Sequence, residues 1–258
     1  MQKLKELGDF QTPKELAQLL IEILRNKDFI PDAIIEPTCG KGSILLEAEK
    51  YFKNSNILGI EIQRKYVDFL SPLIGQNTNI LTVDFFDSID FIKSFVDKNE
   101  NLLFVGNPPW VTNSELSSIN GANLPKKSNI DNLRGIEAIT GKSNFDICES
   151  IIMQLISEFS DKQSVFAFLC KTAVARKIMQ RLWKKDFKYK DAELYPVDSQ
   201  KYFSAAVNSC FFLLDCTEKK SVTTLKIFNS IEEHKFIIES GFINGIYITD
   251  VSKKDSLD

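Results

Sequence analysis

The sequence predicts an α/β protein built on a doubly wound, mostly parallel seven-stranded sheet, with helices on both faces and the last strand antiparallel. Two observations predict this class. Short apolar runs alternate with amphipathic stretches along most of the chain, which is typical of strands joined by crossover helices. Most of these runs are nearly continuous in apolar residues, as expected of strands that are buried on both faces of a sheet.

Seven runs qualify as strands, and six amphipathic stretches qualify as helices. The predicted strands are Ala33–Glu36, Ile57–Ile62, Asn79–Val83, Leu102–Gly106, Ser164–Cys170, Lys188–Tyr195 and Ser209–Cys216. The predicted helices are Pro13–Arg25, Ser43–Phe52, Lys65–Ile74, Ile89–Lys98, Phe145–Phe159 and Thr172–Lys184. The first helix has start signals, because Thr12 is a suitable N-cap, Pro13 suits the first helical position and Glu15 completes a capping box.

The composition is that of an ordinary globular protein. The chain has 258 residues, of which 43% are apolar and 26% charged, enough for one large domain. Five cysteines without a C-x-x-C pair and a single histidine predict no metal site. No apolar run reaches the length of a membrane span and the N-terminus does not resemble a signal peptide, so we expect a reducing, cytoplasmic setting. The net charge of −3 means that any nucleic-acid binding must rest on local basic patches.

The most informative motif is Asn107-Pro108-Pro109-Trp110, which follows the predicted strand Leu102–Gly106. Two prolines remove two backbone donors and fix two φ angles, so the turn is stiff and its carbonyl groups are left unpaired by local structure. An amide side chain and a large aromatic ring flank this corner. Together they offer acceptors for an amino group and a flat surface for a ring, as a pocket for a swung-out nucleobase requires.

Three further strand ends carry polar groups that would meet at the same edge of the sheet. Glu36-Pro37-Thr38-Cys39-Gly40-Lys41-Gly42-Ser43 closes one strand and opens a helix, and its glycines allow close backbone approach to a ligand. Glu61 ends the next strand, at the offset where dinucleotide folds place a carboxylate on ribose hydroxyls. Asp84 and Phe85 follow the third strand. Each of these signals has an ordinary structural alternative, but their succession on three strand ends favours a ligand site.

This set of motifs, in this order, resembles the N6-adenine DNA methyltransferases of the amino-methyltransferase class in which an F-x-T-P segment comes first, a group found in restriction-modification systems. The resemblance covers Gly8 to about Cys216. It is carried by Phe10-Gln11-Thr12-Pro13, the glycine loop, Asn107-Pro108-Pro109-Trp110 and Gly141-Lys142-Ser143-Asn144-Phe145-Asp146. It implies a Rossmann-like class I fold that uses S-adenosyl-L-methionine.

The resemblance also implies the roles of individual residues. Phe10 and Thr12 would meet the methionine part of the cofactor, Glu61 its ribose, and Asp84 with Phe85 its adenine. The cofactor-binding residues would be Phe10, Thr12, Glu36, Pro37, Gly40, Gly42, Glu61, Asp84, Phe85 and Asn107. The catalytic residues would be Asn107, Pro108, Trp110 and Phe203, the last packing against the flipped base.

The expected domain organisation is a catalytic domain over residues 1–216, with a long substrate loop at 111–144, followed by an extension at 217–258. The extension is too short for a target-recognition domain. We expect either that it begins such a domain in a longer protein, or that recognition comes from another polypeptide or from a second copy of the chain. Within the loop, basic residues that we expect to clamp the DNA backbone are Lys126, Lys127, Arg134 and Lys142. Two alternatives remain open: methylation of a protein glutamine or an rRNA amino group by the same fold, and a non-catalytic subunit that binds the cofactor.

Overall fold

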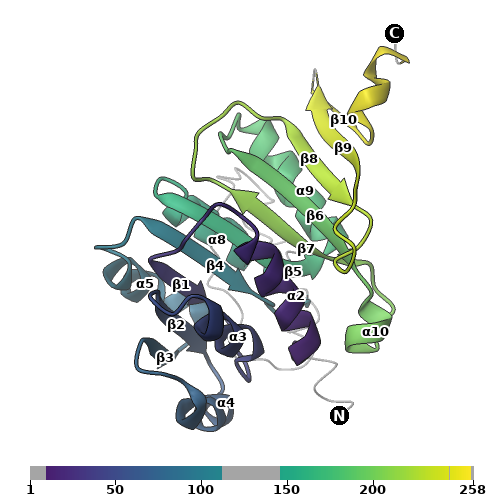
Figure 1. Ribbon diagram of the computed structural model, residues 1–258. Coiled ribbons are helices and arrows are strands. Elements are labelled where there is room, and N and C mark those ends of the chain that lie inside the picture. The colour runs from purple at the N-terminus through teal and green to yellow at the C-terminus, as the bar shows by residue number, and fades with distance from the viewer. Residues whose placement is uncertain (1–9, 112–145, 244, 257–258) are drawn as a thin grey trace, which may run out of the picture.

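The structure is a computed structural model, and it describes residues 10–111, 146–243 and 245–256. Its core is a ten-stranded sheet in the order β10-β9-β8-β6-β7-β5-β4-β1-β2-β3 (Figure 1). The strands are β1 (Ala33–Glu36), β2 (Asn56–Glu61), β3 (Thr78–Thr82), β4 (Asn101–Gly106), β5 (Gln163–Lys171), β6 (Asp191–Val197), β7 (Ser209–Asp215), β8 (Thr224–Phe228), β9 (Phe236–Ile243) and β10 (Ile246–Ile248). The α-helices are α2 (Lys14–Arg25), α3 (Ser43–Tyr51), α4 (Arg64–Leu70), α5 (Ile89–Phe95), α8 (Ile147–Phe159), α9 (Thr172–Lys184) and α10 (Ser199–Phe203). Short 3-10 helices are η1 (Ser71–Leu73), η2 (Phe85–Asp87) and η3 (Val251–Ser256).

All seven predicted strands are present, as β1 to β7. Strands β1 to β5 pair in parallel, and β7 runs antiparallel to both β5 and β6, as predicted. The predicted number of strands was too small, because β8, β9 and β10 extend the same sheet. These three strands lie at one edge and are largely half-exposed, so their apolar pattern is weaker than that of the central strands.

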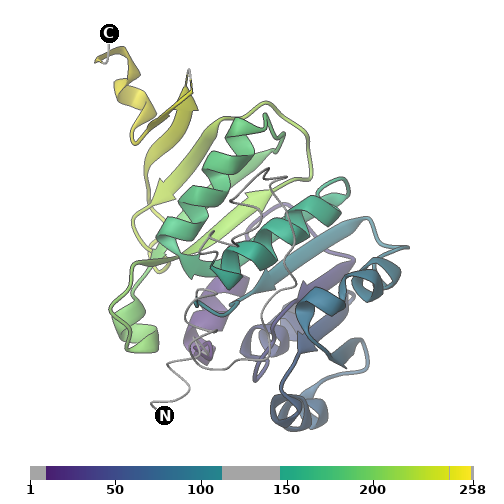
Figure 2. The ribbon, with the colours of Figure 1, turned by 180° about the vertical axis from the view of Figure 1, so that it is seen from behind.

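Helices cover both faces of the sheet, which gives the three layers predicted. Helices α2 and α3 lie together on the face seen in Figure 1, whereas α8 and α9 lie on the opposite face, seen in Figure 2. The amphipathic helix α2 buries Leu16, Leu20 and Ile21 completely, whereas α8 is apolar almost all round and is mostly buried. The burial of these apolar faces, more than helix propensity, holds the helices on the sheet.

The order of strands places the functional motifs at one edge. Strand β1 lies between β4 and β2, so the direction of winding reverses at the β1–β4 boundary. In open α/β sheets, ligands bind outside the carboxyl ends of the strands at this switch point. Glu36, Glu61 and Asn107 end or directly follow β1, β2 and β4, and Asp84 comes two residues after β3.

The predicted capping box of the first helix does not form. Pro13 is the N-cap residue of α2, with no side-chain capping bond, and the helix starts at Lys14. The hydroxyl of Thr12 instead accepts a hydrogen bond of 3.2 Å from the side-chain amide of Asn107. A long-range partner has therefore replaced the local one that the T-x-x-E pattern predicts.

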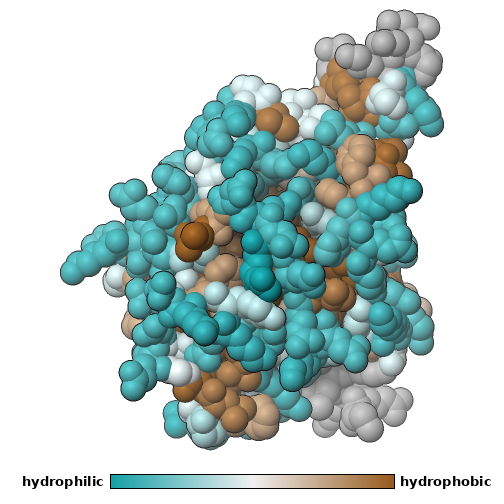
Figure 3. Space-filling view, viewed as in Figure 1, coloured by the Kyte–Doolittle hydropathy of each residue, from teal (hydrophilic) through white to brown (hydrophobic). Residues whose placement is uncertain are grey.

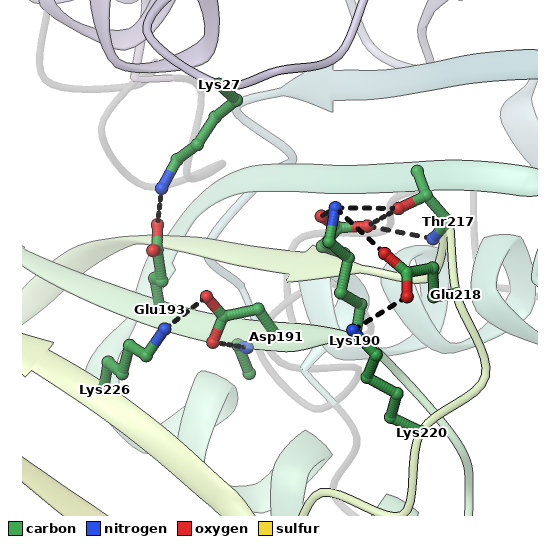
Figure 4. A network of polar contacts seen from close by, with 10 residues as sticks. Lys27, Lys190, Asp191, Glu193, Thr217, Glu218, Lys220 and Lys226 are labelled. Atoms are coloured by element: carbon green, nitrogen blue, oxygen red, sulfur yellow. Dashed lines mark hydrogen bonds and ion pairs between the residues drawn. The ribbon is translucent and has the colours of Figure 1, made fainter.

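The C-terminal strands are tied to the sheet by ion pairs as well as by pairing. Lys226 on β8 contacts Asp191 on β6 at 2.6 Å, and Lys190 lies between Asp215 at 3.5 Å and Glu218 at 3.6 Å (Figure 4). Leu225 on β8 is fully buried. Residues 224–248 therefore share the hydrophobic core of the main sheet.

The surface seen in Figure 3 is mostly hydrophilic, with apolar side chains gathered at its lower end, where Figure 1 places α4. Phe69 on α4 and Leu73 on η1 are about half exposed. This patch lies at the β3 edge of the sheet. Among the residues that the structure describes, no helix has both the length and the apolar content needed to cross a membrane.

Candidate cofactor and catalytic site

A pocket lies across the carboxyl ends of β1 to β4. Its cavity volume is about 280 Å³, near the lower end of the roughly 300–1,000 Å³ that is typical of small-molecule sites, and the cavity is open to solvent on one side. Of the predicted site residues, nine line it: Phe10, Thr12, Glu36, Pro37, Gly40, Glu61, Asp84, Phe85 and Asn107. The pocket therefore joins the amide of the diproline turn to the glycine loop.

The glycine loop is held by the strand beside it. The backbone N–H of Gly40 donates to Glu61 Oε2 at 2.9 Å, while the N–H of Gln63 donates to Glu61 Oε1 at 2.7 Å. Gly40 and Gly42 have φ angles of +53° and +75°, a region that favours glycine. A Cβ at Gly42 would lie 2.5 Å from side-chain carbons of Leu70, so Gly42 packs against α4 and does not line the pocket.

Glu36 places a second carboxylate in the pocket wall. It is 3% exposed, and burial raises its pKa well above the ordinary value, with the nearby charge of Glu61 acting in the same direction. The backbone of Leu45 donates to this carboxylate, which partly opposes the rise in pKa. Glu36 Oε2 has no hydrogen-bond partner in the described part of the chain. A buried acceptor of this kind fits a cationic ligand.

The far end of the pocket is lined by groups suited to an aromatic ring. Asp84 caps η2 by accepting from the N–H of Phe86 at 2.9 Å. Phe85 is buried, and its ring contacts that of Phe86 edge-on at 5.2 Å between centroids. Cys39 also lines the pocket but is 5% exposed, and burial raises the pKa of its thiol, so it remains a protonated packing residue.

The amide of Asn107 has a defined orientation. Its Nδ2 donates to the carbonyl oxygen of Phe10 at 2.7 Å and to Thr12 Oγ1 at 3.2 Å. A carbonyl oxygen can only accept, so the nitrogen must face Phe10 and the oxygen must face away. Asn107 Oδ1 is buried and lacks a partner among the described residues. The site thus presents one free, oriented acceptor.

Three aromatic rings pack together behind this amide. Trp110 lies 5.3 Å from Phe10 and 5.1 Å from Phe203 between ring centroids, and Phe10 lies 5.8 Å from Phe203. The indole N–H donates to the carbonyl of Leu169 at 3.4 Å, and Trp110 is 4% exposed. We call Phe10, Trp110 and Phe203 the aromatic cluster. Neither Trp110 nor Phe203 lines the pocket in this closed arrangement.

The structure also places residues in the pocket wall that the sequence did not single out. In the diproline turn, Pro109 lines the pocket, as does Val111 just after it. The predicted catalytic residue Pro108 is buried and does not line the pocket. Gln11, Thr38, Ser43 and several apolar side chains of α3, α8 and the β2 and β3 ends complete it. Four of these residues had a local signal, because Gln11, Thr38, Ser43 and Pro109 each lie inside one of the motifs of the sequence.

The basic residues of α9 differ in whether they pair with a carboxylate. Lys177 and Arg181 both contact the buried carboxylate of Glu149 on α8, at 2.8 and 3.0 Å. Arg176 has no ion-pair partner within the described ranges, and it lines an open cleft between α9 and the turn before β7. Asp146 caps α8 and pairs with Lys171 at 2.9 Å. The predicted DNA clamps Lys126, Lys127, Arg134 and Lys142 lie outside the described residues, as does the segment 112–145.

The fold is that of the class I S-adenosylmethionine-dependent methyltransferases. Two solved structures share the fold: a modification subunit of a putative type I restriction enzyme from Vibrio vulnificus YJ016 (TM-score 0.52, 14% identity, covering 85% of this chain and 46% of that chain) and a putative class I S-adenosylmethionine-dependent methyltransferase from Listeria monocytogenes (TM-score 0.53, 15% identity, covering 86% and 67%). At these identities the similarity concerns the fold alone.

The sequence comparisons are more specific. Residues 1–115 match the N-6 DNA Methylase family. The chain is 38% identical over 251 residues to the Type II methyltransferase M.NspV of a Nostoc species, a span that covers 95% of this chain and 52% of the relative. The Type II methyltransferase M.CvrRI of Paramecium bursaria Chlorella virus XZ-6E is 35% identical over 106 residues, 41% of this chain and 25% of that relative. The chain is thus similar to the N-6 DNA Methylase family over residues 1–115 and to a Type II methyltransferase over most of its length, and it spans about half the length of that relative.

Proposed function

We propose that this chain transfers a methyl group from S-adenosyl-L-methionine to the N6 amino group of an adenine swung out of DNA, as part of a restriction-modification system. The observation that supports this most directly is the orientation of Asn107. Its nitrogen is fixed by Phe10 and Thr12, which leaves a buried acceptor oxygen at the edge of the cofactor pocket. An oriented acceptor beside a methyl donor is what an amino nucleophile needs.

The chemistry is a displacement in which positioning dominates. The cofactor, when bound, supplies a methyl group on a sulfonium. The adenine amino nitrogen is a poor nucleophile because its lone pair is delocalised into the ring. Asn107 Oδ1 and the Pro108 carbonyl would accept its two N–H bonds and favour the pyramidal geometry of the transition state. The product is transiently cationic and very acidic, so no strong base is required.

The residues of the pocket fit the proposed cofactor. Glu61 would bind the ribose hydroxyls, and Asp84 with Phe85 would hold the adenine ring. The orphaned acceptor of Glu36 would face the cationic methionine portion, together with Phe10 and Thr12. Pro37 and Gly40 would let the backbone approach closely. Gly42, which faces Leu70, would support the loop without touching the cofactor.

The base would be held by the aromatic cluster once it opens. Trp110 and Phe203 now contact each other, so a base can stack on either ring only after the cluster parts. Phe203 sits at the end of α10, on the connection between β6 and β7. A shift of this connection, or of Phe10, would separate the rings of the aromatic cluster and make room for the base.

The partners are proposed from the length of the relatives. Because the chain spans about half of M.NspV, target recognition would come from a further module, in the same or another polypeptide. Strands β8 to β10, which extend the same sheet, would lie next to that module. Lys126, Lys127, Arg134 and Lys142 would clamp the phosphate backbone near the base.

The test is to incubate the protein with labelled S-adenosylmethionine and, in parallel, with unmethylated genomic DNA, rRNA and cell protein, and to analyse nucleosides and amino acids by mass spectrometry. We expect label in N6-methyladenine, and its loss in Asn107→Ala with cofactor affinity within a few-fold of the wild type. Gln18→Ala, on the exposed face of α2, serves as the matched control. Label in protein glutamine or rRNA and none in DNA would identify the alternative substrates. Transfer that is unchanged in Asn107→Ala would make this amide structural.

A further inference from the structure

The segment Phe10–Thr12 is bonded to two separate parts of the site. At its centre, Gln11 Oε1 accepts a hydrogen bond of 2.9 Å from the backbone N–H of Lys41, in the glycine loop. On either side of Gln11, the Phe10 carbonyl and the Thr12 hydroxyl both accept from Asn107 Nδ2. Three consecutive residues therefore connect the loop after β1 with the turn after β4.

We propose that Gln11 is a positioning residue that couples the glycine loop of the cofactor pocket to the amide of Asn107. The inference rests on the proposed function, because it assigns to Gln11 the alignment of the same acceptor with the cofactor. The side chain of Gln11 contacts the glycine loop and lines the pocket. It acts through its two neighbours in the chain.

The contact between Gln11 and the loop is close as well as polar. A Cβ placed on Gly40 would lie 2.7 Å from Gln11 Oε1 and 2.9 Å from its Nε2, so the carboxamide packs directly over the glycine. Gly40 has a φ of +53°, which ties this packing to a backbone shape that other residues rarely adopt. The glycine loop therefore cannot change its backbone conformation unless the carboxamide of Gln11 moves as well.

A movement of Gln11 is transmitted to the amide of Asn107 because the chain after Gln11 is anchored. Pro13 has a fixed φ, and α2 follows with Leu16 and Ala17 fully buried. The segment cannot slide, so a shift of Gln11 rotates the two peptide groups that flank it. These groups carry the Phe10 carbonyl and lead into Thr12, the two acceptors of the Asn107 amide. When the loop is in place, the direction of Asn107 Oδ1 is fixed.

The first experiment uses the protein without cofactor, by NMR. In Gln11→Met, which keeps the length of the side chain but loses the acceptor, we expect the Lys41 amide hydrogen to exchange about tenfold faster, the loss of roughly one net hydrogen bond. The side-chain amide signals of Asn107 should shift in the same variant. Gln11→Glu retains an acceptor and should restore both signals, and Gln18→Ala should change neither.

The second experiment is a double-mutant cycle on the affinity for S-adenosylhomocysteine, measured by calorimetry. If Gln11 couples the two sites, the few-fold weakening of binding by Asn107→Ala should disappear in the Gln11→Met background, a difference of about threefold. A merely structural role of Gln11 would lower thermal stability and leave the two effects independent. In steady-state methylation, Gln11→Met should lower kcat by about tenfold with the KM for DNA unchanged.

The outcomes separate this proposal from the proposed function. Faster exchange at Lys41 with unchanged Asn107 signals, or additive effects in the cycle, would overturn the coupling. If the NMR experiment and the double-mutant cycle both give the expected results but the wild-type protein labels no DNA, the coupling stands and the proposed reaction fails.

Discussion

The carboxylate of Glu61 is joined to the backbone N–H of Gly40 by a hydrogen bond of 2.9 Å, across 21 positions of sequence. Its second oxygen accepts from the N–H of Gln63, so both oxygens are engaged by backbone groups. Glu61 is 6% exposed. The residue that would bind the ribose therefore also sets the shape of the glycine loop.

Replacing Glu61 should accordingly have two distinguishable effects. Glu61→Ala should weaken cofactor binding by more than tenfold, because both the ribose contact and the loop are lost, whereas Glu61→Gln keeps one acceptor for Gly40 and should lose less. Calorimetry with S-adenosylhomocysteine measures the affinity, and exchange of the Gly40 amide reports on the loop. Equal losses in the two variants would show that the loop does not depend on this bond.

Glu36 predicts a pH dependence. Burial raises its pKa in the folded protein, so the folded state binds a proton that the unfolded state has lost, and the free energy of unfolding should fall as pH rises above the ordinary value of 4.5. Glu36→Gln should remove this fall. Urea unfolding from about pH 5 to about pH 8 measures it.

The same residue predicts proton release on cofactor binding. A cationic ligand beside Glu36 favours the ionised form, so up to about one proton should leave per molecule bound at a pH below the raised pKa. Calorimetry in two buffers of different ionisation enthalpy counts the protons. Release that persists in Glu36→Gln would assign the proton to another group.

The aromatic cluster predicts a fluorescence change on substrate binding. Trp110 packs against Phe10 and Phe203, and the second tryptophan can be removed with Trp183→Phe, which leaves Trp110 as the reporter. Binding of a DNA duplex that contains the target should part the rings and change the Trp110 emission. Emission that stays constant while anisotropy shows DNA binding would mean that the cluster remains closed.

The two arginines on α9 should behave differently. Arg181→Ala should lower the free energy of unfolding by about 1.5–3 kcal/mol, because Arg181 pairs with the buried Glu149. Arg176→Ala should change it by less than about 0.5 kcal/mol and instead weaken DNA binding, with a salt slope lower by about 0.9. Urea unfolding and a salt titration of DNA affinity test the pair. A loss of DNA affinity in Arg181→Ala alone would reverse the assignment.

Much of the fold followed from local patterns. Six of the runs, those that became β1, β2 and β4 to β7, are central and mostly buried, so their apolar content marked them clearly, whereas β3 is an edge strand with one buried residue. Strands β8 to β10 were missed because edge strands expose half of their side chains and carry polar residues in between. The Thr12 cap was predicted from neighbours in sequence, whereas its actual partner is 95 positions away.

The amino-acid sequence alone determined which groups stand at the ends of the strands: Glu36, Glu61, Asp84 and Asn107. This was possible because strand order and motif order follow from short-range patterns of apolar and turn-forming residues. Only the tertiary structure decided which way the Asn107 amide points, that Gln11 bonds to the glycine loop, and that Trp110 is covered by two rings. These features depend on contacts between residues far apart in sequence, and their geometry is set by packing that no local pattern encodes.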